Sequence, residues 1–156
     1  MISFRLVFPS EFDLLREIYR QSVLKLAPSL YTPEQVIAWA KAPSHRNKFY
    51  EFIFSPATYV ILQENQVIGF CGLRDDGHIA SFYLHPDFTR QGYGTKLLKY
   101  VLNQGKAKGI KRFYTEASFF SHAVFTRCGF RVIEMETVKY DEIFFTRYKM
   151  ELVLSS

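Results

Sequence analysis

The chain has few cysteines and no long apolar run. Only 2 of its 156 residues are cysteine, Cys71 and Cys128, and they are too few and too far apart for a disulfide framework or a zinc site. We therefore expect free thiols, a cytoplasmic protein and no bound metal. No apolar run approaches the roughly 20 residues that a helix needs to span a bilayer, so we expect no membrane partner. Residues 1–8 lack the pattern of a signal peptide and are interpreted as a first strand.

Clustered positive charge is also absent, although the formal net charge is +5. The basic residues are scattered, and the densest group, in residues 106–112, fits a solvated helix end as well as a binding patch. The overall charge permits an anionic ligand such as a nucleotide cofactor. We expect no nucleic-acid partner, because no basic stripe or nucleic-acid-binding motif is present.

The chain does contain enough apolar material for one packed core. Hydrophobic residues make up 48% of the sequence and aromatic residues 17%, which argues against disorder. A length of 156 residues without repeats, low-complexity segments or a linker favours one domain, and we assign residues 1–156 to it.

Hydrophobic periodicity and turn residues predict the secondary structure. Thr32 is the expected N-cap of one helix, with Pro33 at its first position and Gln35 at its third, and Asp76-Gly77 is the expected turn of one hairpin. The predicted strands are residues 2–8, 58–62, 67–73, 79–84, 112–116, 130–140 and 143–154. The predicted helices are residues 10–26, 33–42, 44–54, 95–108 and 121–128.

The order of these elements indicates the fold class. Residues 79–116 form a strand, a helix and a strand, which implies a right-handed parallel crossover, while residues 58–84 form three strands at short spacing and residues 130–154 form a last hairpin. The sequence therefore predicts an α/β (α+β) fold. Its core is a mixed, mostly antiparallel, seven-stranded central sheet flanked by about four or five helices.

A glycine-rich turn at residues 90–95, Arg-Gln-Gly-Tyr-Gly-Thr, lies between a predicted strand and a predicted helix. Such a turn is typical of an anion site, because the first N–H groups of the helix are unpaired and the helix dipole is positive there. Two glycines alone are equally typical of a plain tight turn.

Two segments together resemble a known family. Residues 82–98, FYLHPDFTRQGYGTKLL, resemble the acetyl-CoA motif of the GNAT superfamily of N-acetyltransferases. Residues 118–130, SFFSHAVFTRCGF, resemble the motif that follows it in the family and ends in Gly-Phe. The resemblance covers residues 58–153, and the first helices would form the family's variable substrate side. It implies the GNAT fold, with a strand split at the cofactor site.

The resemblance implies acetyl-CoA as co-substrate. The backbone amides of residues 90–95 would hold its pyrophosphate, and its pantetheine arm would lie along residues 82–84. A slot between Leu84 and Glu116 would contain the thioester, polarised by a backbone N–H group. The implied cofactor-binding residues are Phe82, Tyr83, Leu84, Thr89, Arg90, Gln91, Gly92, Tyr93, Gly94, Thr95, Ser118, Phe125 and Arg127.

Two positions depart from the family pattern. Thr89 occupies a position where the family usually has Arg or Gln, which removes one side-chain contact to phosphate. Phe125 occupies the position, four residues before Gly129, where many members carry the tyrosine that protonates the leaving thiolate. Phenylalanine cannot donate a proton, so either another group is the acid or the thiolate leaves without a dedicated donor.

Glu116 is the first candidate for the general base, because it is the only acidic residue in the strand beside the expected slot. A surface or paired carboxylate is the alternative. Tyr83 is the second catalytic candidate, with core packing as its alternative. His78, beside a hairpin turn, is interpreted as a solvated residue, and Arg127 either meets the 3′-phosphate of the cofactor or is solvated.

These features together predict an N-acetyltransferase that moves an acetyl group from acetyl-CoA to a primary amine of a small molecule or peptide, by direct attack in a ternary complex. A non-catalytic acyl-CoA-binding sensor or interaction module is the alternative, and Phe125 keeps it open. Tyr31, Trp39, Phe49 and Phe52 either line an acceptor pocket or pack the core. We expect a monomer or a homodimer.

Overall fold

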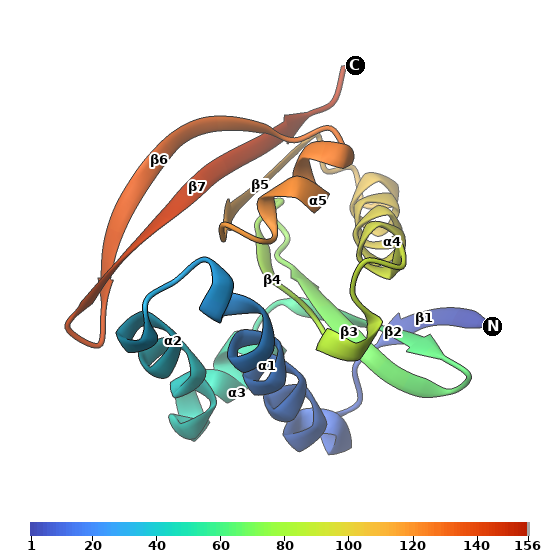
Figure 1. Cartoon of the computed structure of the whole chain (residues 1–156). Coiled ribbons are helices and arrows are strands. Elements are labelled where there is room, and N and C mark those ends of the chain that lie inside the picture. Colours follow the sequence, from blue (N-terminus) through green and yellow to red (C-terminus); the bar gives the residue numbers. More distant parts are fainter. Residues whose placement is uncertain (156) are drawn as a thin grey trace.

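The computed structural model describes residues 1–155, and its elements follow the predicted order (Figure 1). The strands are β1 (Ile2–Leu6), β2 (Ala57–Gln63), β3 (Gln66–Leu73), β4 (Ile79–Leu84), β5 (Arg112–Ala117), β6 (Arg131–Tyr140) and β7 (Ile143–Val153). The α-helices are α1 (Phe12–Leu26), α2 (Pro33–Ala40), α3 (Arg46–Phe54), α4 (Tyr93–Ala107) and α5 (His122–Arg127). The α/β (α+β) fold class is confirmed.

The strands form two antiparallel sheets, in the orders β1-β2-β3-β4 and β5-β7-β6. β4 and β5 meet only at their beginnings, through one parallel bridge between His78 and Tyr114. There the Tyr114 N–H donates to the carbonyl of Gly77 at 3.1 Å, and the Thr115 hydroxyl donates to the carbonyl of Ile79 at 3.0 Å. The sequence predicted a single sheet, but hydrogen bonding between the parallel neighbours β4 and β5 stops at this point. The strands are therefore divided into two sheets. This division is the predicted strand split.

Both faces of the first sheet are covered by helices. Alternate residues of a strand face opposite sides, so Tyr59 and Ile61 of β2 pack into the cluster beneath α4, while Val60 and Leu62 pack into the cluster beneath α1 and α3. Each fully buried apolar side chain of this size contributes about 1.5–3 kcal/mol to folding. Coverage on both faces explains why β2 and β3 read as continuous apolar runs.

The start of α2 has the capping box that the sequence predicts. The backbone N–H of Gln35 donates to Thr32 Oγ1 at 3.2 Å, and the Thr32 N–H donates to Gln35 Oε1 at 2.9 Å. The same side chain donates through Nε2 to the carbonyl of Phe144 in β7 at 3.0 Å. Gln35 thereby attaches the β6–β7 hairpin to the helical layer.

The β6–β7 hairpin is long and curves back toward α2 (Figure 1). Its two turn residues, Asp141 and Glu142, have φ values of 52° and 64°. Positive φ at both central positions is the arrangement of a two-residue type I′ turn, which matches the twist of the flanking strands. The tip of the hairpin contacts α2 through β7, while Asp141 and Glu142 themselves are exposed.

Gly105 permits the close approach of α4 to β5. A Cβ atom at this position would lie 2.5 Å from Cε1 of Phe113 and 3.2 Å from Leu73. The Phe113 ring is fully buried and cannot move aside without disturbing the core.

We expect Gly105→Val to destabilise the protein by about 2–3 kcal/mol, because the added carbons overpack a closed core. The measurement is urea unfolding, read as a lower midpoint with an unchanged slope. Asn103→Val, on the exposed face of the same helix, introduces the same side chain and is expected to change stability by less than about 0.5 kcal/mol. Equal midpoints for the two variants would contradict the packing assigned to Gly105.

Candidate active site

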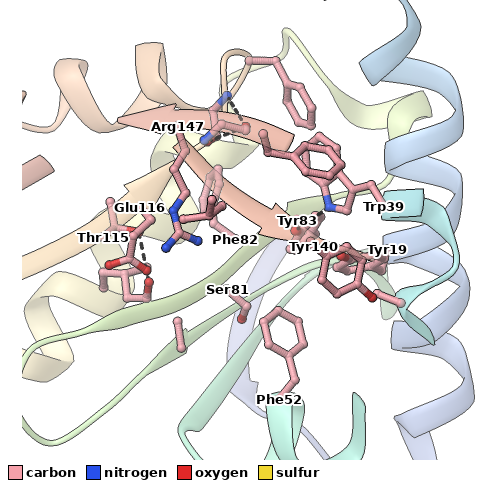
Figure 2. A pocket seen from close by; sticks show the side chains of 18 of the residues that line it. Tyr19, Trp39, Phe52, Ser81, Phe82, Tyr83, Thr115, Glu116, Tyr140 and Arg147 are labelled. Atoms are coloured by element: carbon pink, nitrogen blue, oxygen red, sulfur yellow. Dashed lines mark hydrogen bonds between the residues drawn. The ribbon is translucent and has the colours of Figure 1, made fainter. Parts of the chain in front are cut away.

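A cavity of about 720 Å³ lies where β4 and β5 separate (Figure 2). Residues 79–83 of β4 form one wall, and Thr115 and Glu116 of β5 with Phe125 of α5 form a second. The remaining wall comes from α1–α3 and from the hairpin tip, residues 138–147. The predicted strand split therefore opens into a cavity that is lined by side chains from distant parts of the chain.

The free edge of β4 faces this split. The His85 N–H donates to the carbonyl of Ile68 at 2.7 Å, and the β3–β4 register then pairs Tyr83 with Phe70. Hydrogen-bonded pairs alternate along an antiparallel ladder, so Tyr83 directs its backbone groups to β3. Phe82 and Leu84 direct theirs to the opposite edge, from which β5 has departed. An extended ligand can add to such an edge as a further strand.

The turn before α4 has the backbone of an anion site. Arg90 and Gly92 have φ values of 61° and 85°, and no side chain caps the helix. Within residues 1–155, the N–H groups of residues 93–95 have no acceptor, and the first N–H of the helix to be bonded is that of Lys96, to Gly92. A Cβ at Gly92 would meet no atom within 4 Å, so the space beside the turn is open and the left-handed backbone is what favours glycine.

The side chains of this turn mostly stabilise the turn itself. The Thr89 hydroxyl and the Gln91 amide donate to carbonyls of the preceding 3-10 turn at 3.0 and 3.3 Å. The Tyr93 hydroxyl accepts a hydrogen bond from Gln63 at 3.0 Å, and Arg90 is exposed. A Cβ on Gly94 would lie 3.3 Å from the Phe82 ring, and Thr95 is partly exposed in the first turn of α4. Backbone groups, rather than these side chains, are therefore the main donors toward the open space.

The second motif contributes an apolar wall. Phe125 is 2% exposed, and its ring packs edge-on against Phe82, with ring centroids 5.4 Å apart. Ser118 and Ser121 cap the start of α5 reciprocally, with the two Oγ atoms 2.8 Å apart, and both line the cavity. Arg127 is exposed and lies outside the cavity lining.

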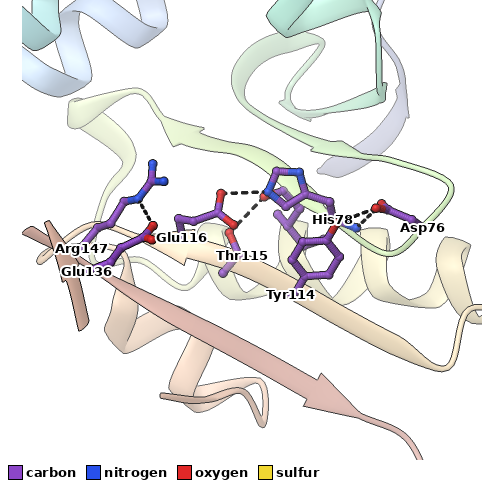
Figure 3. A network of polar contacts seen from close by, with 8 residues as sticks. Asp76, His78, Tyr114, Thr115, Glu116, Glu136 and Arg147 are labelled. Carbon is purple, nitrogen blue, oxygen red and sulfur yellow. Dashed lines mark hydrogen bonds and ion pairs between the residues drawn. The ribbon is translucent and has the colours of Figure 1, made fainter. Parts of the chain in front are cut away.

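Glu116 is paired with His78, which the sequence analysis interpreted as solvated (Figure 3). His78 Nε2 lies 2.9 Å from Glu116 Oε1, and the imidazole stacks on Tyr114 with ring centroids 4.8 Å apart. Asp76 accepts the His78 N–H at 3.0 Å and the Tyr114 hydroxyl at 2.5 Å. This interpretation of His78 was wrong, because the parallel bridge to Tyr114 turns the imidazole toward β5.

The surroundings of Glu116 favour its ionised form. Burial acts to raise the pKa of this carboxyl, but the hydrogen bond to His78 and the charges of Arg147 and Lys149 outweigh burial and lower it. Glu116 is therefore a carboxylate at neutral pH, and it lines the cavity.

Tyr83 of β4 also lines the cavity. Its hydroxyl accepts a hydrogen bond from Trp39 Nε1 at 3.3 Å, and its ring lies 4.3 Å from that of Tyr19. Burial raises the pKa of Tyr83 to about 12, so the phenol is uncharged at neutral pH. In this state it can donate a hydrogen bond, and it both packs against Tyr19 and lines the cavity.

The aromatic residues singled out in the sequence both pack the core and line the cavity. Tyr31, Trp39, Phe49 and Phe52 belong to the cluster beneath α1 and also form the cavity wall. Sequence reasoning missed the hairpin tip, including Tyr140 and Arg147, because its contact with the helices spans more than 100 residues. The aromatic and charged residues around the turn at Asp141 were the one signal that could have indicated it.

Within residues 1–155, no helix is both long and apolar enough to cross a membrane. The same residues contain no group of three His, Cys, Asp or Glu side chains placed to hold a metal ion. Cys71 is buried, Cys128 is half-buried, and both are free thiols.

The chain is similar in sequence to known acetyltransferases. The model of the acetyltransferase (GNAT) domain matches residues 28–152. The protein named "Uncharacterized N-acetyltransferase YafP", from Escherichia coli (strain K12), is 28% identical over 142 residues, which are 91% of this chain and 89% of that protein.

Solved structures share the fold. A GCN5-related N-acetyltransferase from Rhodopseudomonas palustris, described as "Aminotransferase, Class-II", matches with a TM-score of 0.93 and 24% identity, over 97% of this chain and 95% of that chain. The PaiA N-acetyltransferase from Thermoplasma acidophilum, solved in complex with coenzyme A, matches with a TM-score of 0.78 and 18% identity, over 98% and 99%. The family match, which spans most of the chain, confirms the resemblance of the two motifs. This chain therefore belongs to the GNAT family of N-acetyltransferases.

Proposed function

We propose that this enzyme transfers the acetyl group of acetyl-CoA directly to a primary amine held in the cavity, within a ternary complex. The observation that supports this most is the free backbone edge of β4, which runs from the turn before α4 to the cavity that contains Glu116. The order of these features follows the order of the groups in acetyl-CoA. The turn before α4 would bind the diphosphate, the edge of β4 would bind the pantetheine arm, and the thioester would then lie in the cavity beside Glu116.

The residues on the cofactor side fit acetyl-CoA. The unpaired N–H groups of residues 93–95 and the open space at Gly92 suit its diphosphate, and the outward backbone groups of Phe82 and Leu84 suit its pantetheine amides. When bound, acetyl-CoA supplies an electrophilic thioester carbonyl and a thiolate leaving group. A backbone N–H of β4 at the split would stabilise the negative charge that develops on the carbonyl oxygen.

Glu116 is the proposed proton acceptor. Its carboxylate attracts the ammonium form of the acceptor and takes up the proton that the amine releases during attack, directly or through water. His78 holds one carboxylate oxygen at 2.9 Å and so orients the group toward the cavity. His78 is a positioning residue in this scheme, because it does not line the cavity.

Phe125 excludes a tyrosine acid at its position and leaves an apolar surface there. A thiol has a pKa of about 8–9, so the coenzyme can leave as thiolate near neutral pH without a dedicated donor. The same residue favours the second candidate function, a sensor that binds acyl-CoA without catalysis. Release of free thiol on addition of an amine separates the two, because only an enzyme produces it.

We expect Gly92→Glu to weaken acetyl-CoA binding about 30- to 100-fold, since it adds negative charge beside the proposed diphosphate site at a left-handed backbone position. Isothermal titration calorimetry measures the change. Gly109→Glu is the matched control: Gly109 follows the other end of α4, has a φ of 87° and also has open space beside it. Equal affinities in two folded variants would remove the turn from the cofactor site.

We expect Glu116→Gln to lower kcat about a hundredfold and to leave the affinity for acetyl-CoA unchanged, because the amide cannot accept the proton. Stopped-time assays of thiol release give kcat, and calorimetry gives the affinity. A variant with full activity would exclude Glu116 as the base.

We expect His78→Phe to move the acidic limb of the pH profile of kcat/KM to higher pH. The hydrogen bond from His78 lowers the pKa of Glu116, so its loss lets the carboxylate become protonated at a higher pH. His78→Gln retains a side-chain N–H donor and is expected to shift the limb less. A limb that does not move in either variant would show that His78 does not act through Glu116.

A further inference from the structure

The cavity presents charges of both signs. The lining contains two carboxylates, Glu116 and Asp141, and three Lys or Arg side chains, Lys48, Lys139 and Arg147. Lys139 is paired with Glu142 and Arg147 with Glu136, both just outside the lining. An acceptor that carries an acidic group as well as its amine is matched to both signs of charge.

Glu116 and Arg147 carry opposite charges, and both line the cavity. Their side chains are 25% and 38% exposed, whereas Lys48 and Asp141 are exposed residues. Figure 2 shows the Arg147 guanidinium directed toward Glu116. The two charges thus lie together beside the split between β4 and β5.

Arg147 has hydrogen-bonding capacity available for a ligand. Its Nε donates to Glu136 Oε2 at 2.5 Å, which fixes the plane of the guanidinium. In the part of the chain that the structure describes, its terminal nitrogens have no hydrogen-bond partner. A fixed guanidinium with free N–H groups matches the geometry of a carboxylate.

The other end of the cavity is aromatic. Phe120 stacks on Trp39 with ring centroids 5.5 Å apart, and Trp39 donates to the Tyr83 hydroxyl. Figure 2 shows Trp39, Tyr83, Tyr140 and Phe52 around the same space. A planar ring in this region would make favourable offset or edge-on contacts, in addition to burial.

We propose that the acceptor is an α-amino acid with an aromatic side chain, bound by its carboxylate to Arg147, with its amine at Glu116 and its ring beside Trp39 and Tyr83. In an α-amino acid the ammonium and the carboxylate are attached to the same carbon, so the two groups can meet Glu116 and Arg147 at the same time. This assignment rests on the proposed acetyl transfer. The bound ammonium first loses one proton to solvent. The neutral amine nitrogen then forms a bond to the acetyl carbon, the carbon–sulfur bond breaks, the remaining excess proton on nitrogen passes to the Glu116 carboxylate, and coenzyme A leaves as thiolate.

The shape of the cavity favours a free amino acid over a protein chain. The hydrogen bond between Gln35 and Phe144 holds the hairpin against α2, and residues 138–147 of the hairpin line the acceptor side. The volume of about 720 Å³ lies within the range of about 300–1,000 Å³ that is usual for small-molecule sites.

The test compares matched acceptors by release of free thiol from acetyl-CoA. Phenylalanine and phenethylamine share ring and amine and differ in the carboxylate, as do tryptophan and tryptamine. We expect kcat/KM to be about 10- to 100-fold higher for each amino acid, as a charge-assisted hydrogen bond predicts. Alanine, which lacks the ring, and spermidine are expected to be poor acceptors. A preference for spermidine or for the amines without a carboxylate would overturn the proposal.

Arg147→Met is expected to reduce the preference for phenylalanine over phenethylamine to nearly one. Arg147→Lys retains the charge but not the fork, and an intermediate ratio is expected from it, so the test does not depend on one variant folding. Arg131→Met is the control, because Arg131 is an exposed β6 residue paired with Glu151 outside the cavity. An unchanged ratio in both Arg147 variants would overturn the role of Arg147.

The two proposals fail differently. If no amine releases thiol while acetyl-CoA still binds, the acetyl transfer is wrong, and the acceptor assignment is wrong with it. If amines are acetylated without regard to carboxylate or ring, the transfer stands and the acceptor assignment alone is wrong.

Discussion

Hydrogen bonding between β4 and β5 begins at the bridge of His78 with Tyr114 and ends at the carbonyl of Ile79. The free edge of β4, the cavity and the placement of Glu116 all depend on this interruption. It leaves the outward backbone groups of β4 without a strand partner, and it opens the space that becomes the cavity. It also brings Glu116, on the departing strand, to face β4 across the gap. The same bridge turns the imidazole of His78 toward Glu116, so the separation of the strands and the placement of the proposed base have one origin.

The two sides of the cavity are built by different means. The proposed cofactor side is made of backbone: the N–H groups of residues 93–95, set by local conformation, and the edge of β4 that the split leaves free. The proposed acceptor side is made of side chains from α1–α3, β5 and the hairpin, which meet only in the folded chain.

Local patterns predicted most of the fold. The Thr32 and Gln35 capping box and the Asp76-Gly77 turn depend on neighbouring residues, and the structure has both. The motif resemblance located the split, which periodicity alone does not contain. The pairing of His78 with Glu116 could not be predicted, because it depends on a register of strands 36 residues apart. Arg147 could not be placed either, because the curvature of the hairpin is a tertiary property.

The turn of the β6–β7 hairpin affects both the stability of the hairpin and the lining of the cavity. A type I′ turn is best made by Asn-Gly, and residues with side chains pay about 1–2 kcal/mol of strain in the left-handed region. The chain has Asp141 and Glu142 there, and Asp141 also lines the cavity. Asp is well tolerated at the first position of such a turn, so most of the strain falls on Glu142, which is not part of the cavity lining. The two positions of the turn therefore have separate roles: residue 142 affects the stability of the hairpin, and residue 141 presents a side chain to the cavity.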